Sequence, residues 1–164
     1  MFDFNNAKKR LDEVISPTHL FYSEYFSDLA SNNVYIKPEN LQKTGSFKIR
    51  GAYNKLSKLD DASKEVGIIT ASAGNHAQGV AYSASKLGIN ATICMPEQTP
   101  MIKVDGTLKY GANVVLYGEN FDACKDHAIK LAEENGYTFI PPFDDLDVIE
   151  GQGTIGLEII DELE

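Results

Sequence analysis

Two short stretches of the sequence combine residue types that could carry out covalent chemistry. The first is TGSFKIR at residues 44–50, where Lys48 would fall in the first turn of a helix predicted over 46–59. The positive end of the helix dipole, with Arg50 as a second cation, would favour the neutral form of the Lys48 amine. A neutral lysine amine is a nucleophile that forms Schiff bases. The alternative is that Lys48 is an ordinary solvated surface lysine.

The second stretch, SAGNH at residues 72–76, follows a predicted buried strand and opens a predicted helix. Free main-chain N–H groups at a helix start can bind an anion, and open α/β folds bind ligands at the carboxyl edge of a parallel sheet. A carboxylate or a phosphate could therefore bind here. The alternative is that Ser72 or Asn75 simply caps the helix.

A third stretch, GQGTIG at residues 151–156, has the glycine spacing of a dinucleotide-binding loop without its context. Such a loop follows directly on a strand and precedes an acidic residue by about 20 positions. Here the preceding residues, DDLDVIE, do not form a strand pattern, and eight residues follow the last glycine. We therefore expect no dinucleotide site in this stretch.

The elements that must position these residues repeat along the middle of the chain. Four β-branched runs recur about every 23 residues, the spacing of βα units, at 66–71, 90–95, 113–117 and 137–140. The runs are apolar throughout, as buried parallel strands are. Helical periodicity fills 75–87, 100–110 and 120–135, and each of these stretches ends at a glycine. The pattern predicts an α/β fold with an open, doubly wound parallel sheet and flanking helices.

Outside this repeating unit the sequence predicts a strand at 34–37, a loop at 38–45 and a helix at 148–164. The first sixteen residues could add another helix. The helix at 148–164 has neither a cap nor a closing strand after it, so we expect the chain to be part of a longer protein. Cys94 and Cys124 lack the spacing of a disulfide framework or of metal ligands, and Cys124 is expected to fill the core.

The charge balance excludes some partners. Fifteen Lys and Arg against 24 Asp and Glu give a net charge of −9, which offers no electrostatic basis for binding nucleic acid or an anionic membrane. The first residues, MFDFNNAKKRLDEV, are charged where a secretion signal would be apolar, and no run approaches the roughly 18 apolar residues of a membrane span. We expect a cytoplasmic protein.

Four longer strings match a known family in order along almost the whole chain. They are KPENLQKTGSFKIRGAYNK at 37–55, TASAGNHAQGVA at 70–81, KVDGTLKYGANVVLYG at 103–118 and DVIEGQGTIGLEI at 147–159. Together they resemble the threonine dehydratases that depend on pyridoxal phosphate (PLP). The resemblance implies a two-domain PLP fold of the tryptophan-synthase-β type, with the cofactor in the cleft between two open α/β domains.

By this resemblance Lys48 binds PLP covalently and then removes the Cα proton of the substrate, while Phe47 packs against the cofactor ring. Asn75 would hydrogen-bond the phenolic oxygen of that ring. The loop that receives the substrate carboxylate would consist of Ser72, Ala73, Gly74, Asn75 and His76. The cysteines lack metal-ligand spacing, so we predict no metal ligand in this chain.

The reaction that the resemblance implies is elimination of water from a small amino acid. L-Threonine would give 2-oxobutanoate and ammonia, and L-serine would give pyruvate and ammonia, in isoleucine biosynthesis or threonine catabolism. Serine racemases carry a second serine where Ala73 stands, so Ala73 favours dehydration over racemisation. Serine racemase remains one alternative, and a non-catalytic α/β binding or interaction module is another.

Two features of the family are missing from this sequence: the glycine-rich loop that binds the PLP phosphate, and the serine or cysteine that contacts the pyridine nitrogen. The family layout assigns residues 1–60 and 146–164 to a larger domain, which would be incomplete, and residues 61–145 to a smaller open α/β domain. We expect apolar surface on the incomplete domain to make the chain self-associate. The complete protein would be a homo-oligomer, a dimer or a tetramer.

Overall fold

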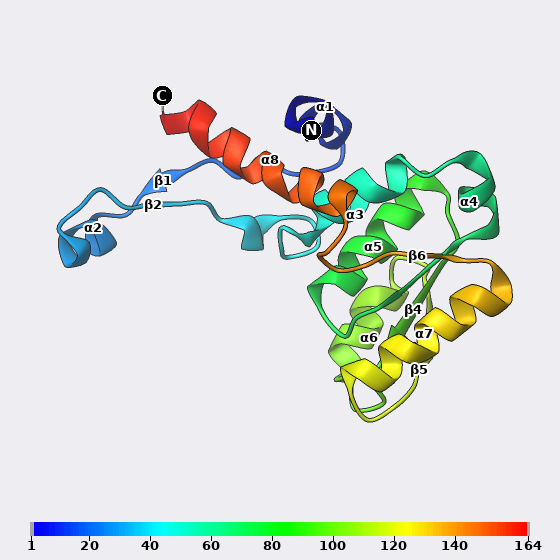
Figure 1. The fold of residues 1–164 in the computed structure, drawn as a ribbon. Coiled ribbons are helices and arrows are strands. Elements are labelled where there is room, and N and C mark those ends of the chain that lie inside the picture. Colours follow the sequence, from blue (N-terminus) through cyan, green and yellow to red (C-terminus); the bar gives the residue numbers. More distant parts are fainter. Residues whose placement is uncertain (1, 164) are drawn as a thin grey trace.

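Four parallel strands form the central sheet of the computed structural model, which describes residues 2–163 (Figure 1). They are β3 (Ile68–Ala71), β4 (Ala91–Met95), β5 (Asn113–Leu116) and β6 (Thr138–Phe139), in the order β5-β4-β3-β6. Strand β3 lies inside the sheet, because Ile68 pairs with Ala91 on one side and with Thr138 on the other. The predicted open parallel sheet is confirmed.

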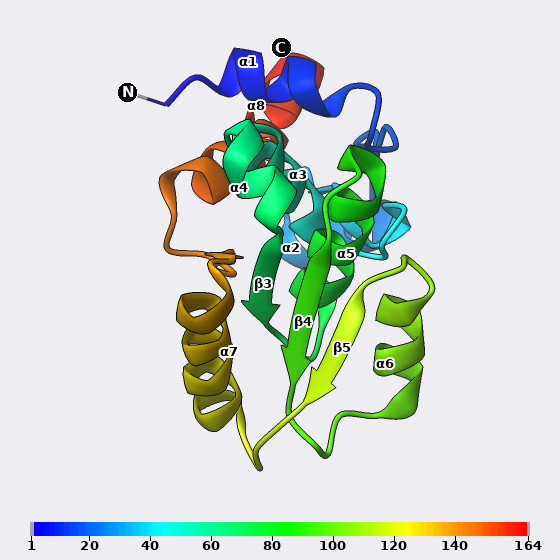
Figure 2. The same cartoon turned by 90° about the vertical axis from the view of Figure 1, so that its right-hand side faces the viewer.

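Helices cover both faces of this sheet (Figure 2). Helices α5 (Asn75–Leu87) and α6 (Met101–Leu108) pack on one face, and α7 (Phe121–Asn135) packs on the other. Gly88 and Gly136 end α5 and α7 with φ of 68° and 73°, a left-handed conformation that favours glycine. The α7 face buries Cys124 and Cys94, and burial raises the pKa of these thiols to about 11 and about 12. The core role predicted for Cys124 is confirmed.

One boundary of the predicted sheet is wrong. Val66 was expected to open the first strand, but it ends a short helix, α4 (Asp61–Val66). The side chain of Asp60 caps that helix by accepting a hydrogen bond from the Ser63 N–H at 2.7 Å. The apolar character of Val66 fits either element, so only the cap distinguishes them.

A second helical layer packs against α5 (Figure 2). It consists of α1 (Phe4–Leu11), α3 (Lys48–Ser57) and α8 (Leu146–Leu163), and α3 packs between α5 and α8. The GQGTIG stretch lies inside α8, so the prediction that it is no dinucleotide loop is confirmed. Its Gly151 permits a close helix crossing, because a Cβ there would lie 2.5 Å from the Arg50 carbonyl oxygen. Residue 164, the last of the predicted helix, lies outside the described residues.

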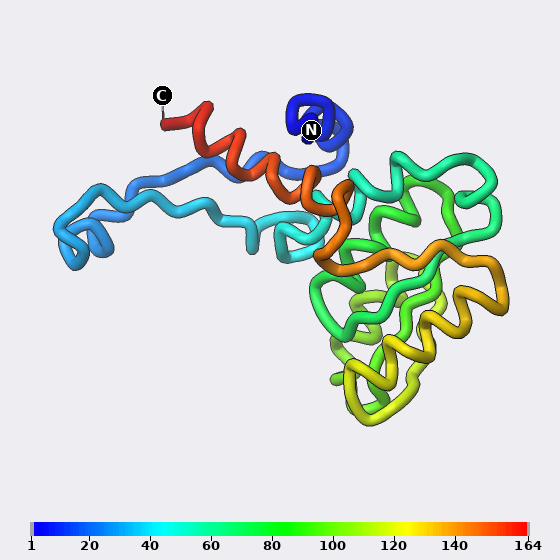
Figure 3. Tube along the Cα trace, in the orientation of Figure 1, coloured from blue at the N-terminus to red at the C-terminus, as the bar shows by residue number. Residues whose placement is uncertain are grey.

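The chain between α1 and α3 forms an arm that projects from the rest of the molecule (Figures 1 and 3). The arm comprises β1 (Phe21–Tyr22), α2 (Glu24–Ala30) and β2 (Tyr35–Ile36), and the one-turn helix η1 (Glu39–Leu41) follows it. The strand predicted at 34–37 is therefore present as β2, but it pairs antiparallel with β1 and not with the central sheet. The arm exposes a set of large apolar side chains: Phe21, Tyr22, Tyr25, Phe26, Leu29 and Tyr35.

Within residues 2–163, no helix combines the length and the apolar character that crossing a membrane requires.

Candidate active site

Lys48 is the first residue of α3 and its amine is half-buried. The Nζ atom donates a hydrogen bond of 2.7 Å to the main-chain carbonyl of Pro142 and lies 5.5 Å from the centre of the Phe47 ring. Burial lowers the pKa of the Lys48 amine below its ordinary value. The interpretation of Lys48 as a freely solvated surface lysine is therefore wrong.

One of the two causes that the sequence suggested for this lowered pKa, the nearby charge of Arg50, is wrong. Arg50 does not act on the Lys48 amine as a second cation, because its guanidinium is fully buried between Glu39 and Glu158. Side chains two positions apart on a helix point to nearly opposite sides, so Lys48 and Arg50 contact different neighbours. Burial, which disfavours the charged amine, is the cause of the lowered pKa of Lys48.

The loop at residues 72–76 joins the carboxyl end of β3 to the start of α5. The Ser72 hydroxyl accepts a hydrogen bond from the Gly74 N–H at 3.3 Å, which shapes the turn without capping the helix. Asn75 is exposed, and the structure gives the start of α5 no side-chain cap. The capping alternative for Ser72 and Asn75 is therefore wrong, and the first N–H groups of α5 are left available to an anion.

The imidazole of His76 is buried instead of facing the loop. Its Nε2 lies 3.3 Å from the Ile140 carbonyl oxygen, which also accepts a hydrogen bond of 2.7 Å from the Thr70 hydroxyl. Burial lowers the pKa of His76 to about 4, so the ring is neutral near pH 7. His76 can thus offer the loop its main-chain N–H, while its side chain ties α5 to the segment after β6.

The 72–76 loop and the carbonyl that Lys48 contacts follow two neighbouring strands, β3 and β6, at the point where the strand order reverses. The chain leaves β3 through α5 to reach β4 on one side, whereas β6 lies on the other side of β3 and is entered from α7 on the opposite face (Figure 2). Open α/β folds bind ligands at such a point, outside the carboxyl ends of the strands. The Ser72–His76 loop follows β3 there, and Pro142 follows β6.

The pattern of residue types did not identify Pro142 as part of the site. Its contribution is a main-chain carbonyl, which every residue possesses, so side-chain chemistry gives no signal for it. The available clue was its position, since the Pro141-Pro142 pair directly follows the last predicted strand and thus lies at the ligand-binding edge of the sheet.

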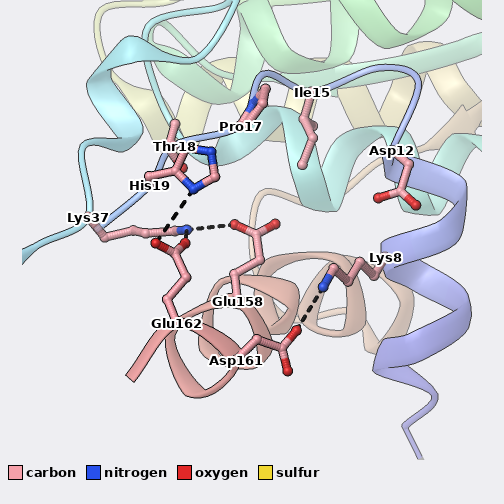
Figure 4. A pocket seen from close by; sticks show the side chains of 10 residues that line it. All are labelled: Lys8, Asp12, Ile15, Pro17, Thr18, His19, Lys37, Glu158, Asp161 and Glu162. Carbon is pink, nitrogen blue, oxygen red and sulfur yellow. Dashed lines mark hydrogen bonds and ion pairs between the residues drawn. The ribbon is translucent and has the colours of Figure 1, made fainter. Parts of the chain in front are cut away.

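A separate cavity lies away from Lys48 and the 72–76 loop. It has a volume of about 280 Å³ and is bounded by α1, α8, Lys37 and residues 15–19 (Figure 4). Its ammonium groups already have partners, because Lys8 pairs with Asp161 and Lys37 with Glu158, both at 2.8 Å. The residues lining this cavity include neither Lys48 nor any residue of the 72–76 loop.

The donor set around Lys48 fits the aldehyde and ring of PLP. A half-buried amine of lowered pKa stands beside the aromatic ring of Phe47. A Cβ added at Gly74 would meet nothing within 4 Å, so the loop faces open space. Metal chemistry has no comparable donor set in residues 2–163, which bring no three His, Cys, Asp or Glu side chains together as ligands.

Comparison with known proteins gives the same assignment. A family model described as pyridoxal-phosphate dependent enzyme matches residues 11–164. The chain is 52% identical over 162 residues to the catabolic L-threonine dehydratase of Staphylococcus aureus, covering 98% of this chain and 47% of that protein. It spans 40–47% of the length of the curated relatives it matches.

Two solved structures share the fold. The processed form of threonine deaminase isoform 2 from Solanum lycopersicum superposes with a TM-score of 0.90 at 45% identity, over 99% of this chain and 47% of that one. Serine racemase from Dictyostelium discoideum superposes with a TM-score of 0.91 at 36% identity, over 98% of this chain and 52% of that one. The expected fold class is confirmed, and the chain belongs to the family of pyridoxal-phosphate dependent enzymes.

Proposed function

We propose that the protein containing this chain is a PLP-dependent L-threonine dehydratase that also accepts L-serine. The observation that carries the proposal is the contact of Lys48: its amine donates to the carbonyl of Pro142, which follows β6, while the Ser72–His76 loop follows the neighbouring strand β3. A nucleophilic amine can bind the aldehyde of PLP. The uncapped start of α5 suits the carboxylate of an amino-acid substrate. The similarity to named threonine dehydratases and deaminases supports the choice of amino acid.

Each residue of the site has a proposed role. Lys48 holds the cofactor covalently and later takes the Cα proton of the substrate. Phe47 packs against the cofactor ring, and Asn75, exposed at the start of α5, donates to its phenolic oxygen. The loop formed by Ser72, Ala73, Gly74, Asn75 and His76 binds the substrate carboxylate, with His76 contributing its main-chain N–H.

When bound, PLP supplies an electron sink for the charge left on Cα, which makes the proton there removable. The chain contributes the base and the binding geometry. The lowered pKa of Lys48 increases the fraction of neutral amine able to accept a proton near pH 7. The start of α5 holds the carboxylate by hydrogen bonds, which orients the Cα–H bond of the substrate.

We assign the remaining parts of the enzyme to residues beyond this chain. Residues 1–60 and 146–164 would form part of a larger domain, and residues 61–145 a smaller one. The glycine-rich loop for the PLP phosphate and the partner of the pyridine nitrogen would come from the rest of the larger domain. The complete enzyme would be a cytoplasmic homo-oligomer, and the relative named as catabolic supports a role in threonine breakdown over isoleucine synthesis.

Serine racemase is the second candidate, because a serine racemase shares the fold at 36% identity. Ala73 argues against it, since racemisation needs a proton donor on the face of Cα opposite Lys48, and a methyl group cannot donate one. Conversion of L-serine mainly to D-serine by the complete enzyme would overturn the dehydratase proposal. A non-catalytic binding module is the third candidate and predicts that neither product forms.

The test is a visible absorption spectrum of the chain with added PLP, before and after borohydride reduction. We expect a long-wavelength band that is absent from Lys48→Ala and present in Lys86→Ala, which removes an exposed lysine of α5. Peptide mass spectrometry should then find the reduced adduct on Lys48. An adduct spread over exposed lysines, with Lys48 unmodified, would contradict the proposed role.

A further inference from the structure

The Lys48–Pro142 contact joins the proposed base to a main-chain carbonyl from a distant part of the chain. The Nζ atom donates to the Pro142 oxygen at 2.7 Å, across a separation of 94 residues. We propose that the Pro142 carbonyl is a positioning group for Lys48: by accepting one N–H of the amine, it fixes the amine and leaves the nitrogen lone pair free for the substrate's Cα proton. This inference rests on the proposed function.

The segment that carries this carbonyl is held at Ile140 by hydrogen bonds to β3 and by a contact with α5. Ile140 donates its N–H to the Ile69 oxygen at 2.8 Å, and its own carbonyl accepts from the Thr70 hydroxyl and contacts the His76 ring. Ile140 is fully buried. Pro141 and Pro142 follow with restricted φ angles, so the carbonyl two residues beyond this anchor has little freedom to move.

The backbone of Lys48 is held as tightly as its partner. A Cβ added at Gly79 of α5 would lie 3.1 Å from the Lys48 carbonyl carbon, so α5 already contacts the main chain of Lys48 closely. Between the Lys48 main chain and the Pro142 carbonyl, which are both held in place, only the Lys48 side chain can move. A hydrogen bond at the far end of that side chain therefore determines where the amine rests.

A carbonyl suits this task better than most side chains. It accepts hydrogen bonds and cannot donate them, so it cannot occupy the lone pair of a neutral amine. When the amine takes the Cα proton, the lone pair forms the new N–H bond and the C–H electron pair remains on the substrate carbon. The Pro142 oxygen keeps its own N–H throughout this transfer. It can also stabilise the resulting ammonium, because hydrogen bonds to charged groups are stronger than neutral ones.

The other groups near the amine do not supply this orientation. His76 is the titratable neighbour from α5, but burial keeps its ring neutral near pH 7 and Ile140 occupies its Nε2. The Phe47 ring attracts a cation without directing a single N–H bond. Arg50 points into the ion pairs with Glu39 and Glu158.

An amide-to-ester exchange tests the carbonyl without changing a side chain. Replacing Phe143 with phenyllactic acid turns the Pro142 carbonyl into an ester carbonyl, a weaker acceptor. The N–H lost from Phe143 donates to no acceptor among residues 2–163. The matched control replaces Asp144 with malic acid, which weakens the Phe143 carbonyl, the acceptor of the Asp145 N–H at 2.7 Å.

The readout is trace acetylation of each lysine by acetic anhydride as a function of pH, resolved by peptide mass spectrometry. In the Phe143 ester we expect the midpoint of the acetylation curve of Lys48 to fall by about one pH unit. The reason is that the charge-assisted hydrogen bond from the ammonium to Pro142 becomes weaker. The Lys48 midpoint in the Asp144 ester, and that of Lys86 in both variants, should match the unmodified chain. Once corrected for the fraction of neutral amine, PLP addition to Lys48 should be several-fold slower in the Phe143 ester alone.

Equal shifts in the two esters, or no shift in the Phe143 ester, would overturn the proposal. Acetylation requires no PLP, so it reports on the Lys48–Pro142 contact separately from the proposed function. Absence of a PLP adduct on Lys48 in the unmodified chain would count against the dehydratase and against a base positioned by Pro142. A midpoint shift without any change in the corrected rate of PLP addition would reject positioning and leave only a hydrogen bond.

Discussion

Arg50 and Glu158 form a two-point ion pair in which the guanidinium is fully buried, with Nη1–Oε1 at 2.6 Å and Nη2–Oε2 at 2.9 Å. Arg50 also donates to both carboxylate oxygens of Glu39, at 2.8 and 2.9 Å. Burial alone would lower the pKa of Arg50, but these hydrogen bonds raise it above its ordinary value. One side chain thus joins α3, η1 and α8 only two residues from Lys48.

Removing this guanidinium should be among the most damaging single substitutions in the chain. Arg50→Ala leaves two carboxylates without their buried partner, and we expect a loss of about 3–5 kcal/mol in the free energy of unfolding. The control is Lys8→Ala, since Lys8 pairs with Asp161 at 2.8 Å and the two side chains are 36% and 52% exposed. That change should cost no more than about 1 kcal/mol. Urea denaturation measures both, and equal losses would contradict the proposed importance of the buried network.

Two glycines of α8 should respond in opposite ways to alanine. A Cβ at Gly151 would lie 2.5 Å from the Arg50 oxygen, so Gly151→Ala should force α3 and α8 apart and cost about 1–3 kcal/mol. A Cβ at Gly156 would meet nothing within 4 Å, so Gly156→Ala should add about 0.5–1 kcal/mol through helix propensity. Thermal unfolding compares the two, and a stabilising Gly151→Ala would show that the crossing is not tight.

His76 should make the chain less stable in mild acid. The pKa of its ring is lowered to about 4 from an ordinary value of 6.5, so the unfolded chain binds a proton that the folded chain refuses between these values. The His76 contribution is complete above pH 6.5 and is lost as the pH falls toward 4. His76→Gln should flatten the slope of stability against pH in this window, because glutamine has no group that titrates there. An unaltered slope in His76→Gln would refute this assignment.

The apolar arm should drive self-association of the isolated chain. Tyr25 and Leu29 on α2 are 72% and 73% exposed, and burying them against another molecule removes apolar surface from water. Replacing both with Asp should reduce the apparent mass in sedimentation velocity at a given concentration. The control is Ile102→Asp on α6, because Ile102 is 77% exposed but lies outside the arm. A chain that is already monomeric before any substitution would rule out this role of the arm.

The central sheet could be predicted from the sequence because its signals are local. The β-branched runs, the helical periodicity and the terminal glycines each lie within a few residues, and α5 was predicted with the observed bounds, Asn75–Leu87. The arm gave little such signal: a strand was predicted at 34–37, but neither its partner β1 nor the helix α2 was. Each of its strands contains only two residues, and a two-residue strand has too few side chains to show a period.

The site was predictable only where side-chain chemistry marks it. Lys48 and the 72–76 loop stood out by residue type and by position at predicted helix starts. Three features depended on contacts between distant residues and could not be foreseen: the Pro142 carbonyl, the burial of the His76 ring and the Arg50 pairing with Glu158. Arg50 shows the limit most clearly, because its neighbour in sequence is Lys48 but its partner in space lies 108 residues away.

The packing of α1 against α8 also fixes the order in which the chain can assemble during synthesis. The Asp3 N–H donates to Glu150, 147 residues later, and Lys8 pairs with Asp161. At about 5–20 residues per second, α1 leaves the ribosome roughly 7–30 s before its partner α8 exists. The βα units between them contact their sequence neighbours and can fold in that interval. Helix α1 is therefore made long before α8 and completes its packing only when α8 is available.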